Sequence, residues 1–372
     1  MAGWNDLPTE LKALIVELID ESGTVRDGTT APSSEERRAL LALSGMERAL
    51  YALTGPMLWE TLMLGTRSLA CVQAFGGAVS SERCRLVRTV DCRRDRFDFD
   101  RTLQAKIAKA CVQALKRTPN VKELRLDGPG SVWVKRLPSL PKLMRKVRTL
   151  NLKTVMEGNL SAADTSAILG SFDKLVDISL PSSIDDEDQL VLSQLQALES
   201  LRKLDLGCPM HSGDELHYPI LSQPWSGRLT FLSLSMWIDE PTLRSLLHQI
   251  GSTLKSFQYA NAMDPSSSAP LLPYNLPVLE HLGLVTAWDG AFELCSAFSN
   301  APLEVMWTSR GDCYYESDLD LLGGVVEQHS STLEVLEIRL GDGDEELGEA
   351  LDRLAAKCKD KQVRFNIVNL WT

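Results

Sequence analysis

Long apolar runs are missing from this chain of 372 residues, since nowhere do 18 apolar residues follow one another. Because a membrane-spanning helix needs about 20 predominantly apolar residues, we expect no such helix. The N-terminus also lacks a basic stretch followed by an apolar run, which is the pattern of a secretory signal peptide. The eight cysteines include no Cys-x-x-Cys pair, so neither a zinc ribbon nor a disulfide framework is indicated. We therefore expect an intracellular protein, located in the cytoplasm, the nucleus or both.

Catalytic motifs are absent as well. The sequence contains no Gly-x-Ser-x-Gly turn, no Gly-rich phosphate loop followed by Lys-Ser/Thr, no His-Glu-x-x-His pair and no Gly-x-Gly-x-x-Gly after a predicted strand. One cluster has the residue types of a zinc site: Cys208, His211, Asp214 and His217. Its spacing supports no defined site, and an ordinary polar loop is the simpler interpretation. We expect neither an enzyme nor a bound metal or cofactor.

The net charge of -11 disfavours general binding to nucleic acid or to anionic membranes. The charge is distributed unevenly, however. Residues 83–153 carry 20 Lys and Arg against 6 Asp and Glu, while the remainder carries 19 against 44. The basic segment either attracts phosphate or an acidic protein, or it consists of solvated outer surfaces that happen to be basic.

A hexapeptide with apolar first, fourth and sixth residues recurs along the chain. It is clearest at Leu201-Arg-Lys-Leu-Asp-Leu206, and it recurs from Val87, Val121, Val147, Leu175, Leu229, Leu254, Leu279, Leu303 and Leu333. The steps between first positions range from 24 to 34 residues, which corresponds to one strand and one return segment per step. The chain therefore resembles the leucine-rich-repeat proteins.

This resemblance implies an α/β solenoid, a curved parallel sheet with outer helices, formed by about ten irregular repeats over residues 65–372. Helical spacing predicts return helices at 100–119, 186–199, 240–250, 289–299, 318–329 and 344–358, several of them starting at an acidic cap such as Asp318. Residues 363–368 read as a last strand, and the Gly-rich segment 65–82 as a helix end and a loop. The longest loops, 207–227 and 260–277, are either functional or mobile.

Strand geometry predicts that the fourth and sixth residues of each hexapeptide point into the core and that the third and fifth point onto the concave face. In the first half of the array these outward residues are charged, and in the second half they include aromatic residues. We expect a protein substrate to bind Phe231, Trp237, His281 and Trp307 on this face. The alternative is that irregular repeats tuck these rings under neighbouring loops.

Residues 1–64 carry two predicted helical segments joined by a Gly-, Ser- and Thr-rich insertion at 21–34. The pattern Leu7-Pro8-x-Glu10-Leu11-x-x-x-Ile15-x-x-Leu18 is followed by Ser44, Arg48, Ala52, Leu53, Pro56, Leu58 and Trp59. These residues resemble an all-α F-box, in the divergent form common in fungal F-box proteins with leucine-rich repeats. Where the family has Val-Cys-Arg-x-Trp, this chain has Met46-Glu-Arg-Ala-Leu50.

The resemblance implies that the first 64 residues bind the Skp adaptor of an SCF-type E3 ubiquitin ligase. The residues implied in adaptor binding are Leu7, Pro8, Leu11, Ile15, Leu18, Leu50, Pro56 and Trp59. The implied function is substrate recognition for that ligase. The alternative is a leucine-rich-repeat scaffold or inhibitor without a ligase role, in which the N-terminal helices merely cap the first repeat.

Overall fold

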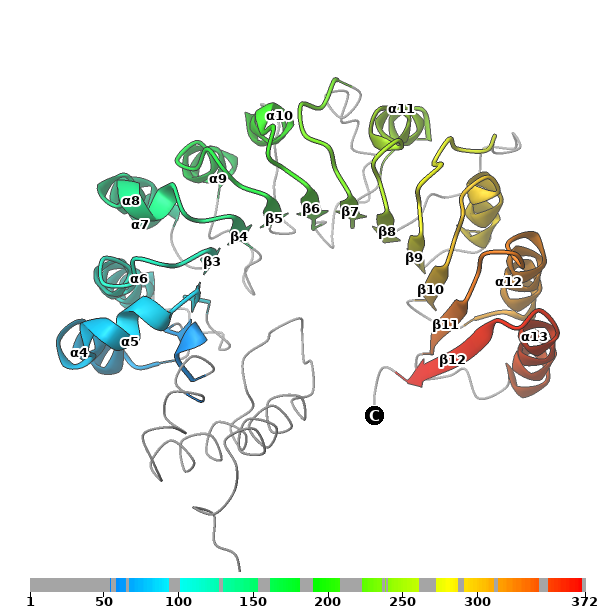
Figure 1. The fold of residues 1–372 in the computed structure, drawn as a ribbon, viewed down its shortest axis with the longest axis horizontal. Coiled ribbons are helices and arrows are strands. Elements are labelled where there is room, and N and C mark those ends of the chain that lie inside the picture. The colour runs from blue at the N-terminus through cyan, green and yellow to red at the C-terminus, as the bar shows by residue number, and fades with distance from the viewer. Residues whose placement is uncertain are drawn as a thin grey trace, which may run out of the picture. The chain divides into compact units, whose positions relative to one another are not determined.

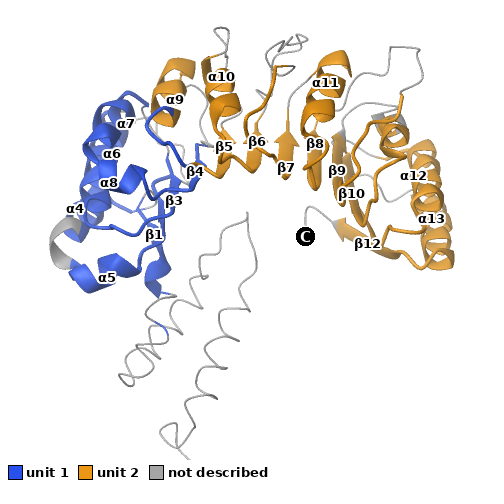
Figure 2. Cartoon of the chain, turned by 45° about the horizontal axis from the view of Figure 1, so that its top comes forward, with its two compact units in different colours: residues 1–160, 170–174 blue, residues 161–169, 175–372 orange. Residues whose placement is uncertain are grey.

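The computed structural model describes residues 54, 58–64, 67–93, 101–126, 130–152, 161–180, 190–207, 223–235, 238, 240–260, 272–286, 291–310, 314–340 and 347–369. The predicted N-terminal module therefore lies mostly outside the described residues. The chain splits into two compact units (Figure 2), one comprising residues 1–160 and 170–174 and the other residues 161–169 and 175–372. Both units repeat a short strand and a return segment, which is usually helical.

Unit 1 contains a parallel sheet with the strands in chain order. Its strands are β1 (Thr61–Met63), β2 (Thr89–Asp91), β3 (Glu123–Arg125) and β4 (Thr149–Asn151). The helices are α4 (Leu69–Ala78), α5 (Ser81–Leu86), α6 (Arg101–Leu115), α7 (Gly130–Arg136), the 3₁₀ helix η2 (Leu137–Ser139) and α8 (Pro141–Met144).

Unit 2 contains a longer parallel sheet, again in chain order. Its strands are β5 (Asp177–Leu180), β6 (Lys203–Leu206), β7 (Phe231–Leu234), β8 (Ser256–Ala260), β9 (His281–Thr286), β10 (Val305–Arg310), β11 (Val335–Leu340) and β12 (Arg364–Asn369). The helices are α9 (Ala162–Leu169), α10 (Leu190–Ala197), α11 (Glu240–Ile250), the 3₁₀ helix η4 (Ala291–Phe298), α12 (Glu316–Gln328) and α13 (Gly348–Asp360). These helices lie on one side of the strands (Figure 1).

The core of both units is built from the repeated hexapeptide. In all ten copies the first, fourth and sixth residues are at most 4% exposed. The strands of successive copies pair in register, so that Leu204 of β6 aligns with Ile178 of β5 and Leu232 of β7. The predicted inward positions are therefore confirmed, as is the α/β leucine-rich-repeat fold. The aligned inward residues of successive strands form rows of apolar side chains, here called the buried columns. Their burial is the main favourable contribution to the free energy of folding.

The N-terminal part of the sheet departs from the sequence prediction in two places. Residues 61–63, assigned to the helical module, form strand β1 and pair with β2. Residues 65–82, predicted as a helix end and loop, contain α4 and α5 instead. The side chain of Ser68 caps α4, and Val72 and Phe75 are buried. This burial outweighs the low helix propensity of the Gly76-Gly77 pair within α4.

The return helices at 100–119, 186–199, 240–250, 318–329 and 344–358 are confirmed as α6, α10, α11, α12 and α13. The segment predicted at 289–299 forms the 3₁₀ helix η4. Asp318 is not the N-cap of α12, because that helix begins at Glu316. The Asp318 carboxylate instead accepts the backbone N–H of Tyr315 at 2.9 Å and forms a buried ion pair with Arg310.

Replacing Leu204 by alanine tests the core assignment. Leu204 is fully buried, so Leu204→Ala should leave a cavity and lower the free energy of unfolding by about 2 to 5 kcal/mol. The adjacent Lys203 is exposed, and Lys203→Ala should change it by less than about 0.5 kcal/mol. Chemical denaturation measures both, and equal effects would contradict the alternation of faces.

A second prediction concerns His329, which follows α12 and is 3% exposed. Its ring Nε2 has no hydrogen-bond partner among the residues that the structure describes. Burial lowers the pKa of His329 because desolvation penalises the imidazolium, and a hydrogen bond with the backbone of Ala301 opposes part of this shift. The unfolded chain therefore binds a proton at higher pH than the folded chain does, and this group makes folding less favourable as the pH falls below about 6.5.

Urea denaturation at about pH 7.5 and about pH 5.5 measures this contribution of His329. The wild-type chain should lose more unfolding free energy across this interval than the His329→Gln variant does, because the variant has no imidazole to protonate. An equal loss in the two proteins would contradict the burial argument.

Candidate protein-interaction face

The sheet face that the described helices leave uncovered, here called the open face, carries the third and fifth residues of each hexapeptide. In unit 2 this face has side chains that are exposed or half-buried, among them Phe231 on β7, His281 on β9 and Trp307 on β10. His281 is exposed, whereas Phe231 and Trp307 are half-buried. Trp237, the fourth residue predicted to bind a substrate, lies outside the described residues.

The register shows how these residues are arranged. Phe231 aligns with Ser256, Ser256 with His281, and His281 with Val305. Phe231 and His281 therefore lie in one row, two strands apart, which corresponds to about 9 to 10 Å of sheet. Trp307 lies in the next row, where it aligns with Gly283 on β9 and Glu337 on β11. The predicted residues thus occupy one face, but Trp307 neighbours Gly283 rather than His281 in register.

The Trp307 side chain is held by the strands on both sides. Toward β9, its indole occupies the space above Gly283, because a methyl group added to Gly283 would lie 2.6 Å from the indole Nε1. Toward β11, the guanidinium carbon of Arg339 lies 4.1 Å from the centre of the indole. Arg339 is itself held by Glu337, whose Oε1 accepts a hydrogen bond from Nε at 2.8 Å.

This arrangement suits an interaction anchor. An aromatic ring that is fixed before binding loses little conformational freedom when a partner arrives. The cation–π contact with Arg339 also fixes the guanidinium, which brings a positively charged group beside the ring. Together with the exposed His281 and the half-buried Val305 and Val335, Trp307 forms a mixed aromatic and apolar surface on strands β9 to β11. We call it the Trp307 surface.

Buried contacts also support the end of β10. The hydroxyl of Tyr314 donates to Thr308 Oγ1 at 3.0 Å, and both groups are buried. The guanidinium carbon of Arg310, in an ion pair with Asp318, lies 4.2 Å from the centre of the Tyr315 ring. These contacts hold Tyr314 and Tyr315 against β10 and thereby support the strand that carries Trp307.

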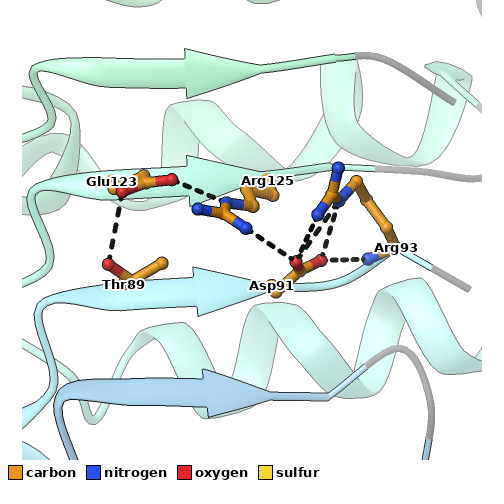
Figure 3. Close-up of polar contacts among 5 residues, drawn as sticks. All are labelled: Thr89, Asp91, Arg93, Glu123 and Arg125. Atoms are coloured by element: carbon orange, nitrogen blue, oxygen red, sulfur yellow. Dashed lines mark hydrogen bonds and ion pairs between the residues drawn. The ribbon is translucent and has the colours of Figure 1, made fainter. Parts of the chain in front are cut away.

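The open face of unit 1 has a different chemistry, because its charged residues pair with one another (Figure 3). Asp91 on β2 accepts hydrogen bonds from the backbone N–H of Arg93 at 2.9 Å and from its Nη2 at 2.8 Å. Arg125 on β3 lies 3.6 Å from the same carboxylate and donates its Nε to Glu123 at 2.6 Å. Thr89 also donates to Glu123, at 3.4 Å.

The predicted charged character of the first half is therefore confirmed, but these charges neutralise each other locally. Asp91 is 1% exposed and Arg125 is 8% exposed. Removing one member of such a network would leave a buried charge without its partner, which is costly. This network therefore stabilises unit 1 and offers a partner little free charge.

The residues implied in adaptor binding lie outside the described part of the chain, with the exception of Trp59. Trp59 is half-buried, and the guanidinium carbon of Arg83 on α5 lies 5.3 Å from its ring centre. Among the described residues, no group of three or more His, Cys, Asp or Glu side chains is placed to hold a metal ion. Within that same part of the chain, every helix is too short or too polar to cross a membrane.

Sequence reasoning missed Gly283 and Arg339 as parts of the Trp307 surface. Gly283 is the fifth residue of its hexapeptide, and Trp307 is the fifth residue of the next one. Their alignment could therefore have been predicted from the repeat. Arg339 comes directly after the sixth residue of its hexapeptide, so the repeated pattern does not include it. The sequence gives no signal for the direction in which the indole turns.

A double-mutant cycle tests the contact between Gly283 and Trp307. Gly283→Ala should displace the indole and lower the free energy of unfolding by about 1 to 3 kcal/mol. In a Trp307→Ala background the same change should cost much less, because the obstructing ring is gone. Chemical denaturation of the wild type, the two single variants and the double variant gives the coupling free energy between the two residues.

Gly324 provides the matched control. It lies in helix α12, and a methyl group added there would meet nothing within 4 Å. Gly324→Ala should therefore be neutral or stabilising by up to about 1 kcal/mol, because alanine has the higher helix propensity. Additive effects of Gly283→Ala and Trp307→Ala would show that the two residues do not touch.

Comparisons with known proteins identify no family for the chain. No family model matches it, and no curated protein does. Among solved structures, it is similar to the crystal structure of the Rad7 and Elc1 complex in yeast, at 14% sequence identity and a TM-score of 0.42, over 90% of this chain and 88% of that chain. The repeat assignment accordingly rests on the chain's own strand register and buried columns.

Proposed function

We propose that this chain is a substrate-recognition subunit of an SCF-type ubiquitin ligase. In this proposal, residues 1–64 bind the Skp adaptor and the Trp307 surface of unit 2 binds a protein substrate. The chain contributes binding alone, and ubiquitin transfer is carried out by other subunits. Joining two binding modules in one chain raises the effective concentration of the substrate near the ligase.

The arrangement of Trp307 carries the substrate-binding half of the proposal. Interfaces derive most of their energy from a few aromatic and arginine residues in well-packed surroundings. Trp307 and Arg339 are such a pair, and they contact each other on the face that the helices leave open. His281 lies on the same face, and Phe231 extends the surface by two further strands, to β7.

The F-box resemblance supports the adaptor-binding half. Leu7, Leu11, Ile15 and Leu18 recur at the spacing of one helical face. An apolar stripe of this kind is suited to a groove or helix on a partner. The repeat sheet begins directly after this motif, because strand β1 starts two residues after Trp59.

A pull-down with purified Skp adaptor tests this half most directly. The full-length wild-type chain should bind, and the variant with Leu7→Asp and Ile15→Asp should not, because two carboxylates on the apolar stripe disfavour its burial. The melting temperature of the repeats should not change, since the substitutions lie outside the buried columns.

Two controls accompany this pull-down. Thr9→Asp with Ala13→Asp adds the same charge to the opposite side of the predicted helix, and Trp307→Ala alters the proposed substrate surface. Both variants should bind the adaptor as the wild type does. If the wild-type chain fails to bind, or if the Leu7 and Ile15 variant binds equally well, the chain is a repeat scaffold whose N-terminal helices act only as a cap.

A further inference from the structure

A row of cationic residues lies where the strands of unit 1 begin. The second residue of each hexapeptide is fixed there by a backbone ladder. Lys122 and Glu123 both donate their N–H groups to the carbonyl of Arg88, at 2.7 and 3.1 Å. Arg148 and Thr149 do the same to the carbonyl of Lys122. Arg88, Lys122 and Arg148 are therefore successive members of one row, with the strand spacing of about 4.8 Å between neighbours.

Further cations surround this row. Lys146 donates its Nζ to the carbonyl of Pro119 at 2.6 Å. Arg88 donates its Nη1 to the carbonyl of Asn120 at 3.4 Å. Arg148 donates its Nη1 to the carbonyl of Arg145 at 3.0 Å. Asn120 donates its Nδ2 to the carbonyl of Arg85 at 2.8 Å. The six residues, here called the entry-edge cations, are Arg85, Arg88, Lys122, Arg145, Lys146 and Arg148.

The side chains of Arg88, Lys146 and Arg148 donate to carbonyl and amide oxygens. Among the described residues, no Asp or Glu lies within ion-pair distance of any of the six. The carboxylates of Asp91 and Glu123 on the open face already pair with Arg93 and Arg125. In the sequence, the stretch from 128 to 156 has seven Lys and Arg and no Asp or Glu. The side chains of Arg85, Lys122 and Arg145 are exposed.

In unit 2 the second residues of the hexapeptides include anions as well as cations. Lys255 is the second residue of its hexapeptide, and its Nζ lies 2.7 Å from the carboxylate of Glu280, the second residue of the next one. The hydrogen bond and the charge of Glu280 raise the pKa of Lys255. Glu304 and Glu334 continue this row. In unit 2 this position therefore carries both signs of charge, since Arg202 also occupies it. In unit 1 it carries three successive cations after Glu60, whose carbonyl accepts the N–H of Arg88 at 2.8 Å.

We propose that the entry-edge cations bind an acidic segment of a partner protein. The segment would lie across the starts of β2, β3 and β4 and supply carboxylates, or phosphorylated side chains, as ion-pair partners for these six cations. Exposed pairs of this kind contribute little singly but act together on encounter and orientation. The proposal does not depend on adaptor binding, since all six cations lie beyond residues 1–64.

The remaining charge of the chain favours a short acidic peptide over a nucleic acid. Outside residues 83–153 the chain has 19 Lys and Arg against 44 Asp and Glu. The negative charge of the rest of the chain would repel a long polyanion.

Fluorescence anisotropy of the full-length chain with a fluorescein-labelled glutamate decapeptide tests this proposal. The wild type should bind it, and binding should weaken as salt is added. The triple variant Arg85→Glu, Lys122→Glu and Arg145→Glu should bind about tenfold more weakly or worse, because three attractions become repulsions. These side chains are exposed and make no hydrogen bond or ion pair with the described residues, so the melting temperature of the variant should remain that of the wild type.

The triple variant Lys203→Glu, Arg228→Glu and Lys359→Glu is the matched control. It changes the net charge equally at exposed sites in unit 2 and should retain peptide binding. A phosphoserine peptide of equal charge distinguishes phosphate from carboxylate as the preferred group. The proposal is overturned if the wild type does not bind either peptide, or if both triple variants lose binding equally. It is also overturned if single-stranded DNA of equal charge binds as tightly as the peptides.

Discussion

Burial of the first, fourth and sixth hexapeptide residues is the constraint on which the rest of the structure depends. Because side chains alternate between the two faces of a strand, a slip of one residue would move every apolar column to the open face. The columns therefore fix the register, and the register decides which side chains meet. Trp307 lies beside Gly283, and Arg125 beside Asp91, because the fourth and sixth residues of their hexapeptides are buried at matching levels.

The repeat made the strands and their inward faces predictable, because one residue pattern specifies each of them. It did not make the return segments equally predictable. Helix α4 forms despite Gly76-Gly77 because Val72 and Phe75 are buried, and burial by distant residues is invisible in a local pattern. Strand β1 could have been predicted, since Trp59, Leu62 and Leu64 occupy the first, fourth and sixth positions of the same hexapeptide pattern.

The candidate site was predicted in part. Phe231, His281 and Trp307 do occupy the open face, but the contacts that fix Trp307 depend on Gly283 and on Arg339, a residue outside the repeated pattern. The charged half was predicted by residue type, whereas its mutual pairing depends on side-chain conformations (Figure 3). The two units consequently offer different chemistry, with an aromatic surface on the open face of unit 2 and a cationic edge on unit 1.

Hydrogen exchange of the full-length chain, alone and with saturating Skp adaptor, tests the central claim most directly. We predict that the adaptor protects backbone amides within residues 1–64 and leaves those of β9 to β11 unchanged, so that the Trp307 surface stays available to a substrate. Protection of β9 to β11 by the adaptor, or no protection of residues 1–64, would contradict the proposal that this chain recruits substrates to a ubiquitin ligase.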